Sequence, residues 1–528
     1  MNRFAISSKT RHGTCAVLLA IVAGLLFVLP GCGIPRLHMA ECSPPMPDTF
    51  NGMITENNSA EIPVEDFFTD PILNQLIAQG LVGNQELRIL AQDIQIANNE
   101  YRRRQGAWLP FFGLNTGARL DKYSYNTLPG SDNIQNTPIS AAHFPKPLPD
   151  FMVAGNVTWQ LDIWRQLRNA RDAQSRRYLG TIDGRTYTLT RLIAEIAENY
   201  YTLMALDKRI ENLDIIIALQ QQSLELSKAR KEAARGTELA VQRFQAEVQK
   251  NQSEKLILYQ NIVEVENRIN FLVGRFPQPV QRMSSGFLDL SLPALSVGAP
   301  SELLQNRPDI RQAERELEAA GIEISVARAN FYPKLFITAG VGYEAFNTKY
   351  LFLTPESLIY NTAGQLVAPL INKSAIRADY MNANAKQLQA VYEYQRTVIN
   401  AFTEVINRVS KVRNYTTSIQ IKRQQLESLE QAVSAAGSLF QNARVEYMDV
   451  LLAQRDLNDA RVVLIETKKE QLSAIVNAYQ ALGGGAGAYP SYLDPDAVIT
   501  VPEGAQIPPP PVKVKPEEVV PPPPQPPK

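Results

Sequence analysis

Few side chains in this sequence are of a type that carries out catalysis. The candidates are three histidines and three cysteines, namely His12, His38, His143, Cys15, Cys32 and Cys42. No CxxC, HExxH, GxGxxG or GxxxxGK[ST] motif is present, so neither a zinc site, a dinucleotide site nor a P-loop is indicated. The carboxylates are numerous, but on helices they are more typical of a solvated face than of an acid–base pair. We therefore expect no enzyme active site, no metal site and no cofactor.

Cys32 is the exception, because the residues before it predict a covalent modification. Three cations precede the apolar run 16–29, which is too short to span a bilayer but has the length of a signal-peptide core. The run ends in Leu-Pro-Gly-Cys, a close match to the bacterial lipoprotein box, so cleavage would leave a lipid-carrying Cys32 as the first mature residue. Gly33, in the second position, permits sorting to the outer membrane. An ordinary cleaved signal peptide is the alternative, and Cys42 then has no partner for a disulfide.

The charge balance argues against nucleic acid as a partner. Lys plus Arg and Asp plus Glu both number 53, which gives a net charge of zero. Nucleic-acid binding would need a basic excess on one face. The 45% hydrophobic and 20% charged content is that of an ordered protein.

Two unusually long helices are predicted to position the rest of the chain. Residues 150–276 contain none of the 35 prolines, and residues 185–235 also lack glycine. Since both residue types oppose helix formation, we expect one helix over about 165–235, softened near its start by Gly180 and Gly184. Its apolar residues recur every seven positions, the spacing of a coiled coil: Leu189, Ile196, Leu203, Ile210, Ile217 and Leu224.

The same unit recurs further along the chain, which indicates an internal duplication. Residues 370–489 are again free of proline, and their heptad lies 209 residues after the first: Val398, Val405, Val412, Ile419, Leu426 and Val433. Shorter helices over 86–105 and 309–330 open the two copies. The return helices, over 239–272 and up to Leu482, are about half as long as the outgoing ones. We therefore expect the opening helices to cover the other half, stacked end to end with the return helices.

Alternating apolar and polar residues after each opening helix predict four strands, over 112–121, 151–161, 335–345 and 360–367. The link 123–150 is about 14 residues longer than its counterpart 346–359, as expected of an exposed loop. Four strands cannot close into a barrel, and lipid does not tolerate an open sheet edge. The expected fold is therefore mainly α with a membrane β-barrel. Three chains would give a barrel of twelve strands, joined to long coiled-coil helices.

These elements divide the chain into six predicted parts. They are a signal peptide (1–31), a lipid-anchored tether (32–66), a first repeat (67–277), a linker (278–300), a second repeat (301–488) and a disordered tail (489–528). The tail holds two tetraproline runs, a composition that cannot pack a core.

A family resemblance rests on motifs in both copies. Residues 300–315 read PSELLQNRPDIRQAER and residues 327–333 read ARANFYP; shorter matches are WQLDIW at 159–164 and NFLVGR at 270–275. Together they resemble the TolC-type outer-membrane efflux proteins, in particular the NodT-like lipoprotein branch of RND efflux systems. The resemblance implies a passive homotrimeric duct, anchored by lipid: a twelve-stranded barrel in the outer membrane and a long α-helical coiled-coil tunnel as its large periplasmic part. A periplasmic adaptor protein would join it to an inner-membrane RND-type pump.

The resemblance also implies roles for residues at the periplasmic tip. The family's tip pattern matches residues 440–451, with Ala443 where glycine is usual. Asp449 is the candidate for a ring of carboxylates that narrows the closed end, and Gln242 is the corresponding gate residue of the first copy, although it is not acidic. The alternative for Asp449 is an ordinary charge at a helix N-terminus. The adaptor would dock at two turns, made of Gly236, Thr237, Glu238, Leu239, Ala443, Arg444, Val445, Glu446 and Tyr447.

Two other functions stay open from the sequence. One is the outer-membrane duct of a type I protein secretion system, and the other is a periplasmic coiled-coil scaffold without a channel. The sequence names neither the exported substrate nor the pump and adaptor.

Overall fold

The computed structural model describes residues 34–41, 45–124, 126, 147–369, 373–442 and 444–486. Cys32, Ala443, the signal peptide and the proline-rich tail lie outside these residues. The chain divides into two compact units. Unit 1 combines Met1–Cys42, Asn99–Arg176 and Glu316–Tyr392, and unit 2 combines Ser43–Asn98, Arg177–Arg315 and Glu393–Lys528.

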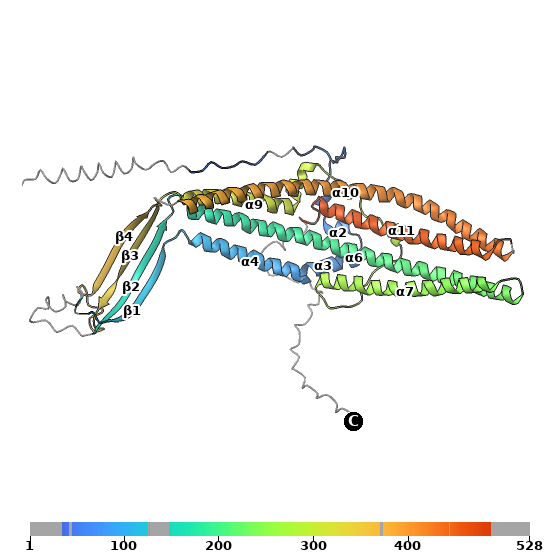
Figure 1. Ribbon diagram of the computed structural model, residues 1–528, viewed down its shortest axis with the longest axis horizontal. Helices are drawn as coiled ribbons and strands as arrows, with labels where there is room; N and C mark the ends of the chain where they lie inside the picture. The colour runs from blue at the N-terminus through green and yellow to red at the C-terminus, as the bar shows by residue number, and fades with distance from the viewer. Residues whose placement is uncertain are drawn as a thin grey trace, which may run out of the picture. The chain divides into compact units, whose positions relative to one another are not determined.

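The two predicted copies have the same order of elements (Figure 1). The first copy contains α3 (Pro71–Gly83), α4 (Gln85–Gly106), β1 (Phe111–Asp121), β2 (Leu148–Leu161), α6 (Gln166–Glu232) and α7 (Glu238–Val273). The second contains α8 (Leu303–Asn306), α9 (Pro308–Ala329), β3 (Lys334–Ala345), β4 (Leu358–Val367), α10 (Ser374–Gln441) and α11 (Tyr447–Ala481). Short helices precede or join them: η1 (Ser59–Glu61), α2 (Val64–Phe67), η2 (Phe287–Asp289) and η3 (Pro300–Glu302).

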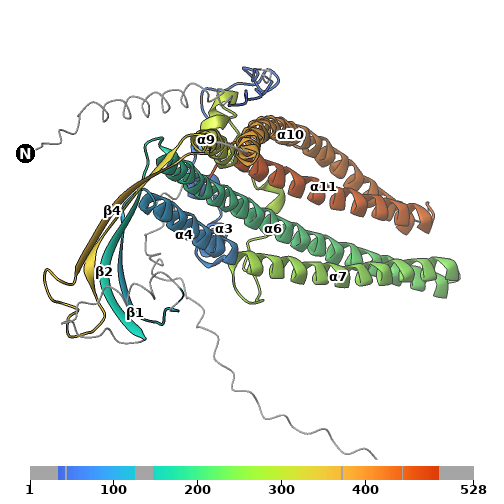
Figure 2. The same ribbon diagram turned by 60° about the vertical axis from the view of Figure 1, so that its left-hand side comes forward.

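Unit 1 contains one antiparallel sheet in the order β1-β2-β3-β4 (Figure 2). Phe111 pairs with Thr158, and Lys334 pairs with Val367. The strand ends that connect to α4, α6, α9 and α10 therefore all lie at one end of the sheet. The four predicted strands are confirmed, although β2 begins at Leu148, three residues before the predicted start at 151.

The long helices are confirmed as single elements. Helix α6 has 67 residues and α10 has 68, so each is roughly 100 Å long at 1.5 Å per residue. Gly180 and Gly184 do not interrupt α6, and their softening of its start stays a prediction. In the structure they give α9 room: a β-carbon at Gly180 would lie 3.3 Å from the Cβ of Arg315, and one at Gly184 would lie 2.9 Å from the side chain of Gln312.

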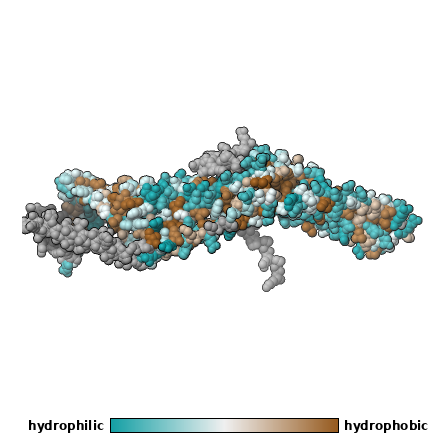
Figure 3. All heavy atoms as spheres, turned by 90° about the horizontal axis from the view of Figure 1, so that it is seen from above, coloured by the Kyte–Doolittle hydropathy of each residue, from teal (hydrophilic) through white to brown (hydrophobic). Residues whose placement is uncertain are grey.

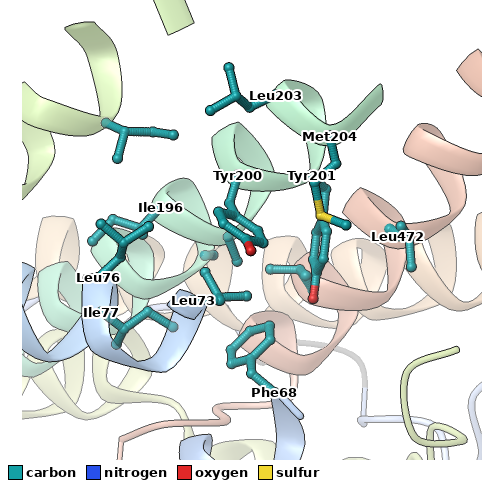
Figure 4. Close-up of a cluster of buried hydrophobic side chains, with 14 of the residues drawn as sticks. Phe68, Leu73, Leu76, Ile77, Ile196, Tyr200, Tyr201, Leu203, Met204 and Leu472 are labelled. Carbon is teal, nitrogen blue, oxygen red and sulfur yellow. The ribbon is translucent and has the colours of Figure 1, made fainter. Parts of the chain in front are cut away.

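The largest core of unit 2 forms where α3, α6, α7 and α11 meet (Figure 4). Tyr200 and Tyr201 of α6 are buried there with Phe68 and Leu472. The Tyr200 hydroxyl donates a 2.6 Å hydrogen bond to Asp70, whose other oxygen caps α3 by accepting from the backbone. Burial, and then the bond to Asp70, raise the pKa of Tyr200 far above its usual value. The hydroxyl therefore remains a hydrogen-bond donor at any physiological pH.

The predicted end-to-end stacking is confirmed in both copies. Gly274 ends α7 with φ of 79°, and a β-carbon there would lie 2.1 Å from the Gly83 carbonyl, at the start of α4. Gly483 ends α11 with φ of 97°, and its β-carbon would lie 2.5 Å from the Asn306 carbonyl, just before α9. Only glycine fits this left-handed conformation and this close approach.

Part of the predicted tether is folded, so the prediction of a tether over 32–66 is wrong for its second half. Phe50 is fully buried and stacks on Phe402 of α10, with 5.3 Å between ring centroids. Asn58 pairs with Val297 of the inter-copy linker. Burying an aromatic ring stabilises this segment even though its sequence has no regular period. The linker is ordered too: Arg282 forms ion pairs with Asp207 and Glu266.

Candidate functional site

The sheet of unit 1 has two chemically different faces. Residues that pair directly across neighbouring strands lie on the same face of the sheet. The strand register therefore tells which face each side chain is on. One face carries large apolar side chains that are mostly exposed, among them Phe112 and Leu114 (both 72%) and Tyr360 (81%). An exposed apolar face of this kind needs another apolar surface or lipid to cover it.

The opposite face is polar and carries little charge at mid-strand. Gly113, Asn156, Gly340 and Asn361 pair in one row across the four strands. The two amides lean over Gly340, since a β-carbon there would lie 2.5 Å from Asn361 Oδ1 and 2.6 Å from Asn156 Oδ1. The residues of this row can hydrogen-bond with water, but they carry no charge that would bind an ion tightly.

The α6–α7 turn is held by its own helix start. Thr237 caps α7 by accepting from the Ala240 backbone. Glu238 accepts a 2.7 Å hydrogen bond from Gln242 and forms an ion pair with Lys231. The bond from Gln242 and the Lys231 cation hold the pKa of Glu238 below its usual value, so this carboxylate stays ionised near neutral pH.

The α10–α11 turn contains a capping box. The Asp449 carboxylate accepts from the backbone N–H of Glu446 at 3.2 Å, and the Glu446 side chain accepts in return from the backbone of Asp449. This is the arrangement expected of an ordinary charge at a helix N-terminus. The predicted gate residues Asp449 and Gln242 thus each hydrogen-bond within the start of their own helix.

The two turns are joined by contacts that the sequence patterns did not indicate. The Arg230 guanidinium of α6 lies over the Phe440 ring, 4.4 Å from its centroid, and donates a 3.0 Å hydrogen bond to the Phe440 carbonyl. Phe244 of α7 is fully buried and packs edge-on against Tyr447 of α11 at 6.5 Å. Tyr447 is therefore the predicted docking residue that links one turn to the other helical hairpin.

Among the described residues, no group of three or more His, Cys, Asp or Glu side chains could hold a metal ion. Within the described ranges, no helix is both long enough and apolar enough to cross a membrane. Apolar and polar patches alternate over the helices in Figure 3, as expected when each helix has a narrow apolar stripe.

The sequence matches the model of a known family over most of this architecture. The outer membrane efflux protein model matches residues 76–275 and 299–484, which cover both copies. The chain belongs to the outer membrane efflux protein family. An efflux protein of this family is the outer-membrane channel of an efflux pump and not an enzyme, so the predicted family, function and absence of enzymatic activity are confirmed.

Individual efflux proteins are similar along nearly the whole chain. The cation efflux system protein CusC of Escherichia coli K12 is 25% identical over 480 residues, 89% of this chain and 99% of its own. The toluene efflux pump outer membrane protein TtgF of Pseudomonas putida is 26% identical, over 82% of this chain and 87% of its own. The open state of the MtrE outer membrane channel of Neisseria gonorrhoeae has the same fold, with a TM-score of 0.75 and 21% identity over 86% of this chain and 98% of its own.

Proposed function

We propose that three copies of this efflux protein form one passive duct that carries small molecules from the periplasm to the exterior. An adaptor protein and an RND-type pump open the duct at the α6–α7 and α10–α11 turns. Small molecules are the proposed cargo because the relatives that are similar over most of their length are named for cation and toluene efflux. Protein export is the competing function.

The open sheet of unit 1 is the observation that carries this proposal. Among the residues that the structure describes, its outer strands β1 and β4 each have one neighbouring strand, and an unpaired strand edge is not tolerated in lipid. Strand directions alternate across the sheet, so β4 of one copy and β1 of the next would pair antiparallel without reversing either. Closure by three copies gives twelve strands, with the exposed apolar face toward lipid and the polar face toward the duct.

The described N-terminal segment supports a lipid anchor on Cys32. Ile34 packs against Phe331 and Tyr380 in unit 1, close to the start of β3. Further along, the backbone of His38 donates to and accepts from the side chain of Asn384, at 2.8 and 3.0 Å. Cys32 can lie no more than about 7 Å of chain from Ile34, so its acyl chains would enter the membrane beside the sheet.

Disulfide trapping between copies tests the closed barrel. In a Cys42→Ser background, Thr116→Cys on β1 is combined with cysteines at Tyr360, Thr362 or Gly364 of β4, which share its face of the sheet. Oxidation should convert one of these pairs into a covalent trimer on denaturing gels. Gly117→Cys replaces Thr116→Cys in the control, because its thiol points to the other face and should not crosslink. A ladder ending at dimers, or equal crosslinking of the control, would contradict closure by three copies.

Loss of the protein separates the two cargo classes. A deletion strain should become more sensitive to small toxic compounds, and the wild-type chain should restore resistance. Loss of a secreted protein from the medium without any change in sensitivity would instead favour type I secretion. Metabolic labelling with palmitate, which Cys32→Ser should abolish, tests the anchor independently of both outcomes.

A further inference from the structure

One end of the sheet in unit 1 combines aromatic side chains, at three of its four connections to a helix, with cationic side chains. Trp108 precedes β1, Trp164 follows β2 and Tyr332 precedes β3. The Trp164 ring stacks on Tyr332 with 4.7 Å between centroids, and its Nε1 donates a 2.7 Å hydrogen bond to the carbonyl of Pro333. Tryptophan and tyrosine rings gather where a membrane meets water, because they are apolar with one polar group.

Four cations near these rings along the chain have no ion-pair partner among the described residues. Arg102, Arg165, Arg328 and Arg377 each lie within about ten residues of a strand end, and none of them forms an ion pair with a residue that the structure describes. Lys334 is unpaired as well, but it lies on the polar face of the sheet with Gly340. Arg168, by contrast, is neutralised by Asp162 at 3.1 Å.

The helices do not account for these charges. Neither α6 nor α10 has an acidic residue in its first turn, and the positive end of a helix dipole disfavours nearby cations. Arg165 and Arg377 flank the starts of these two helices, so they raise the local positive potential rather than balance it.

The opposite end of the sheet has no comparable surplus in its described residues. Arg119 pairs there with Asp121 at 2.8 Å and with Asp150 at 3.6 Å. Glu344 pairs with Met152 near the same end of the β2–β3 ladder and adds a further carboxylate. Lys122 and Lys349 also lie at that opposite end, but its carboxylates balance its cations. Among the described residues, the surplus of positive charge therefore lies at the end of the sheet that bears Trp164 and Tyr332.

We propose that this end of the sheet is a binding surface for the phosphate headgroups of anionic phospholipids, with Arg102, Arg165, Arg328 and Arg377 as the cationic residues. The lipid-facing side of the strands ends at this surface, so headgroups of the adjoining leaflet lie at the level of the cations. The proposed anchor on Cys32 would enter the bilayer at the same end, since Ile34 packs beside the start of β3. The surface retains anionic lipid around the channel and fixes the depth of the sheet in the membrane.

The test compares the full-length protein with the variant R102Q/R165Q/R328Q/R377Q in nanodiscs of equal phosphatidylglycerol and phosphatidylcholine. A cation near an anionic surface favours binding by about fivefold. Native mass spectrometry should therefore show phosphatidylglycerol retained several-fold over phosphatidylcholine by the wild type, and at near parity by the variant. The wild-type preference should also weaken as salt is raised.

A matched variant controls for the loss of four charges. R88Q/R243Q/R413Q/R455Q removes four exposed arginines of unit 2 and should keep the wild-type lipid preference. Equal preference in all three proteins would overturn the proposal. So would an unchanged lipid preference combined with a shift in ion selectivity in planar bilayers, which would place the cations in the duct. If the fourfold variant does not fold, Arg165→Gln and Arg377→Gln are measured singly, and each should reduce the preference. The same spectra report the oligomer, so failure of the trimer is seen separately.

Discussion

Arg307 should contribute more to the stability of the second repeat than any exposed cation of that repeat. Its side chain is only 3% exposed, and its guanidinium contacts Asp309 at 2.7 Å and Glu404 at 3.0 Å. It also donates a 2.8 Å hydrogen bond to the carbonyl of Ala481, at the end of α11. One side chain thus joins the start of α9 to α10 and to the end of α11.

The loss of folding stability on removing Arg307 depends on the two carboxylates that are left without their partner. Breaking a fully buried ion pair costs about 3–5 kcal/mol, because the remaining charge has no partner. The side chains of Asp309 and Glu404 are 18% and 27% exposed, so water solvates them in part and we expect about 2–3 kcal/mol for Arg307→Ala. Arg408→Ala is the control: it contacts the same Glu404 at 3.9 Å and is 35% exposed, so its loss should cost about 0.5 kcal/mol.

The first repeat supplies a second matched variant. Asn84, 223 residues before Arg307, donates a 2.8 Å hydrogen bond to the Leu272 carbonyl at the end of α7. Arg307→Asn should therefore regain the bond to Ala481, worth about 1 kcal/mol, but leave both carboxylates unpaired. Adding Glu404→Gln to Arg307→Asn should recover part of the remaining loss.

Unfolding rates in denaturant, at fixed protein concentration, give the comparison. A loss of 2–3 kcal/mol that falls wholly on unfolding accelerates it about 30- to 140-fold. Arg307→Ala should unfold fastest, followed by Arg307→Asn, the double variant and the wild type. If Arg307→Ala and Arg408→Ala unfold within twofold of one another, the argument from burial is refuted.

Three further predictions use single side chains. Phe50→Ala should destabilise the protein by about 3 kcal/mol, measured by the same unfolding rates, whereas a segment that acts only as a tether would show no change. Gly274→Ala should be more destabilising than Gly286→Ala, because both have φ near 80° but only Gly274 would place a β-carbon against the backbone of Gly83; equal losses would mean that backbone strain alone matters. Asp449→Ala should raise closed-state conductance in planar bilayers and reduce cation preference, and Asp449→Ser, which retains a capping oxygen, should do the same; unchanged currents in both would exclude Asp449 from the gate.

Most of the regular structure could be predicted because local signals repeat in this chain. The absence of proline and the heptads located α6 and α10, and the duplication allowed each boundary to be checked against its counterpart. The caps at Asp70 and Gly274 are local in the same way, because capping oxygens and left-handed glycines are properties of a few neighbouring residues. These features depend on short stretches of chain, so periodicity and residue type suffice.

The failures involve contacts between distant residues. The position of Phe50 depends on Phe402, more than 350 residues away. Residues 45–66 show no apolar periodicity from which the burial of Phe50 could be predicted. The contact of Arg230 with Phe440 joins the two copies at their turns. It likewise could not be predicted from the sequence of either copy alone. Gly180 appeared to weaken a helix, yet its lack of a side chain serves the packing of α9 against α6. In each case the partner, and not the local sequence, decides the role.

Comparison of the two repeats indicates how one ion-pair arrangement was modified after duplication. The carboxylates are retained: Glu86 corresponds to Asp309, and Glu195 corresponds to Glu404, at the repeat spacings of 223 and 209 residues. Their cations differ. In the first repeat Arg191 pairs with Glu86, and Arg268 pairs with Glu195, whereas in the second repeat Arg307 serves both carboxylates.

This difference makes the two helix junctions unequal. Arg191 and Arg268 are about half exposed, at 52% and 47%, so their ion pairs contribute about 1 kcal/mol or less each. At the positions equivalent to them the second repeat has Asn400 and Asn477, and the cation that contacts both carboxylates, Arg307, is buried. Because a buried cation shared by two carboxylates is far costlier to separate than two exposed pairs, the junction between α9 and α11 resists opening more than the junction between α4 and α7. A motion that bends the helices at these junctions should therefore occur first in the first repeat.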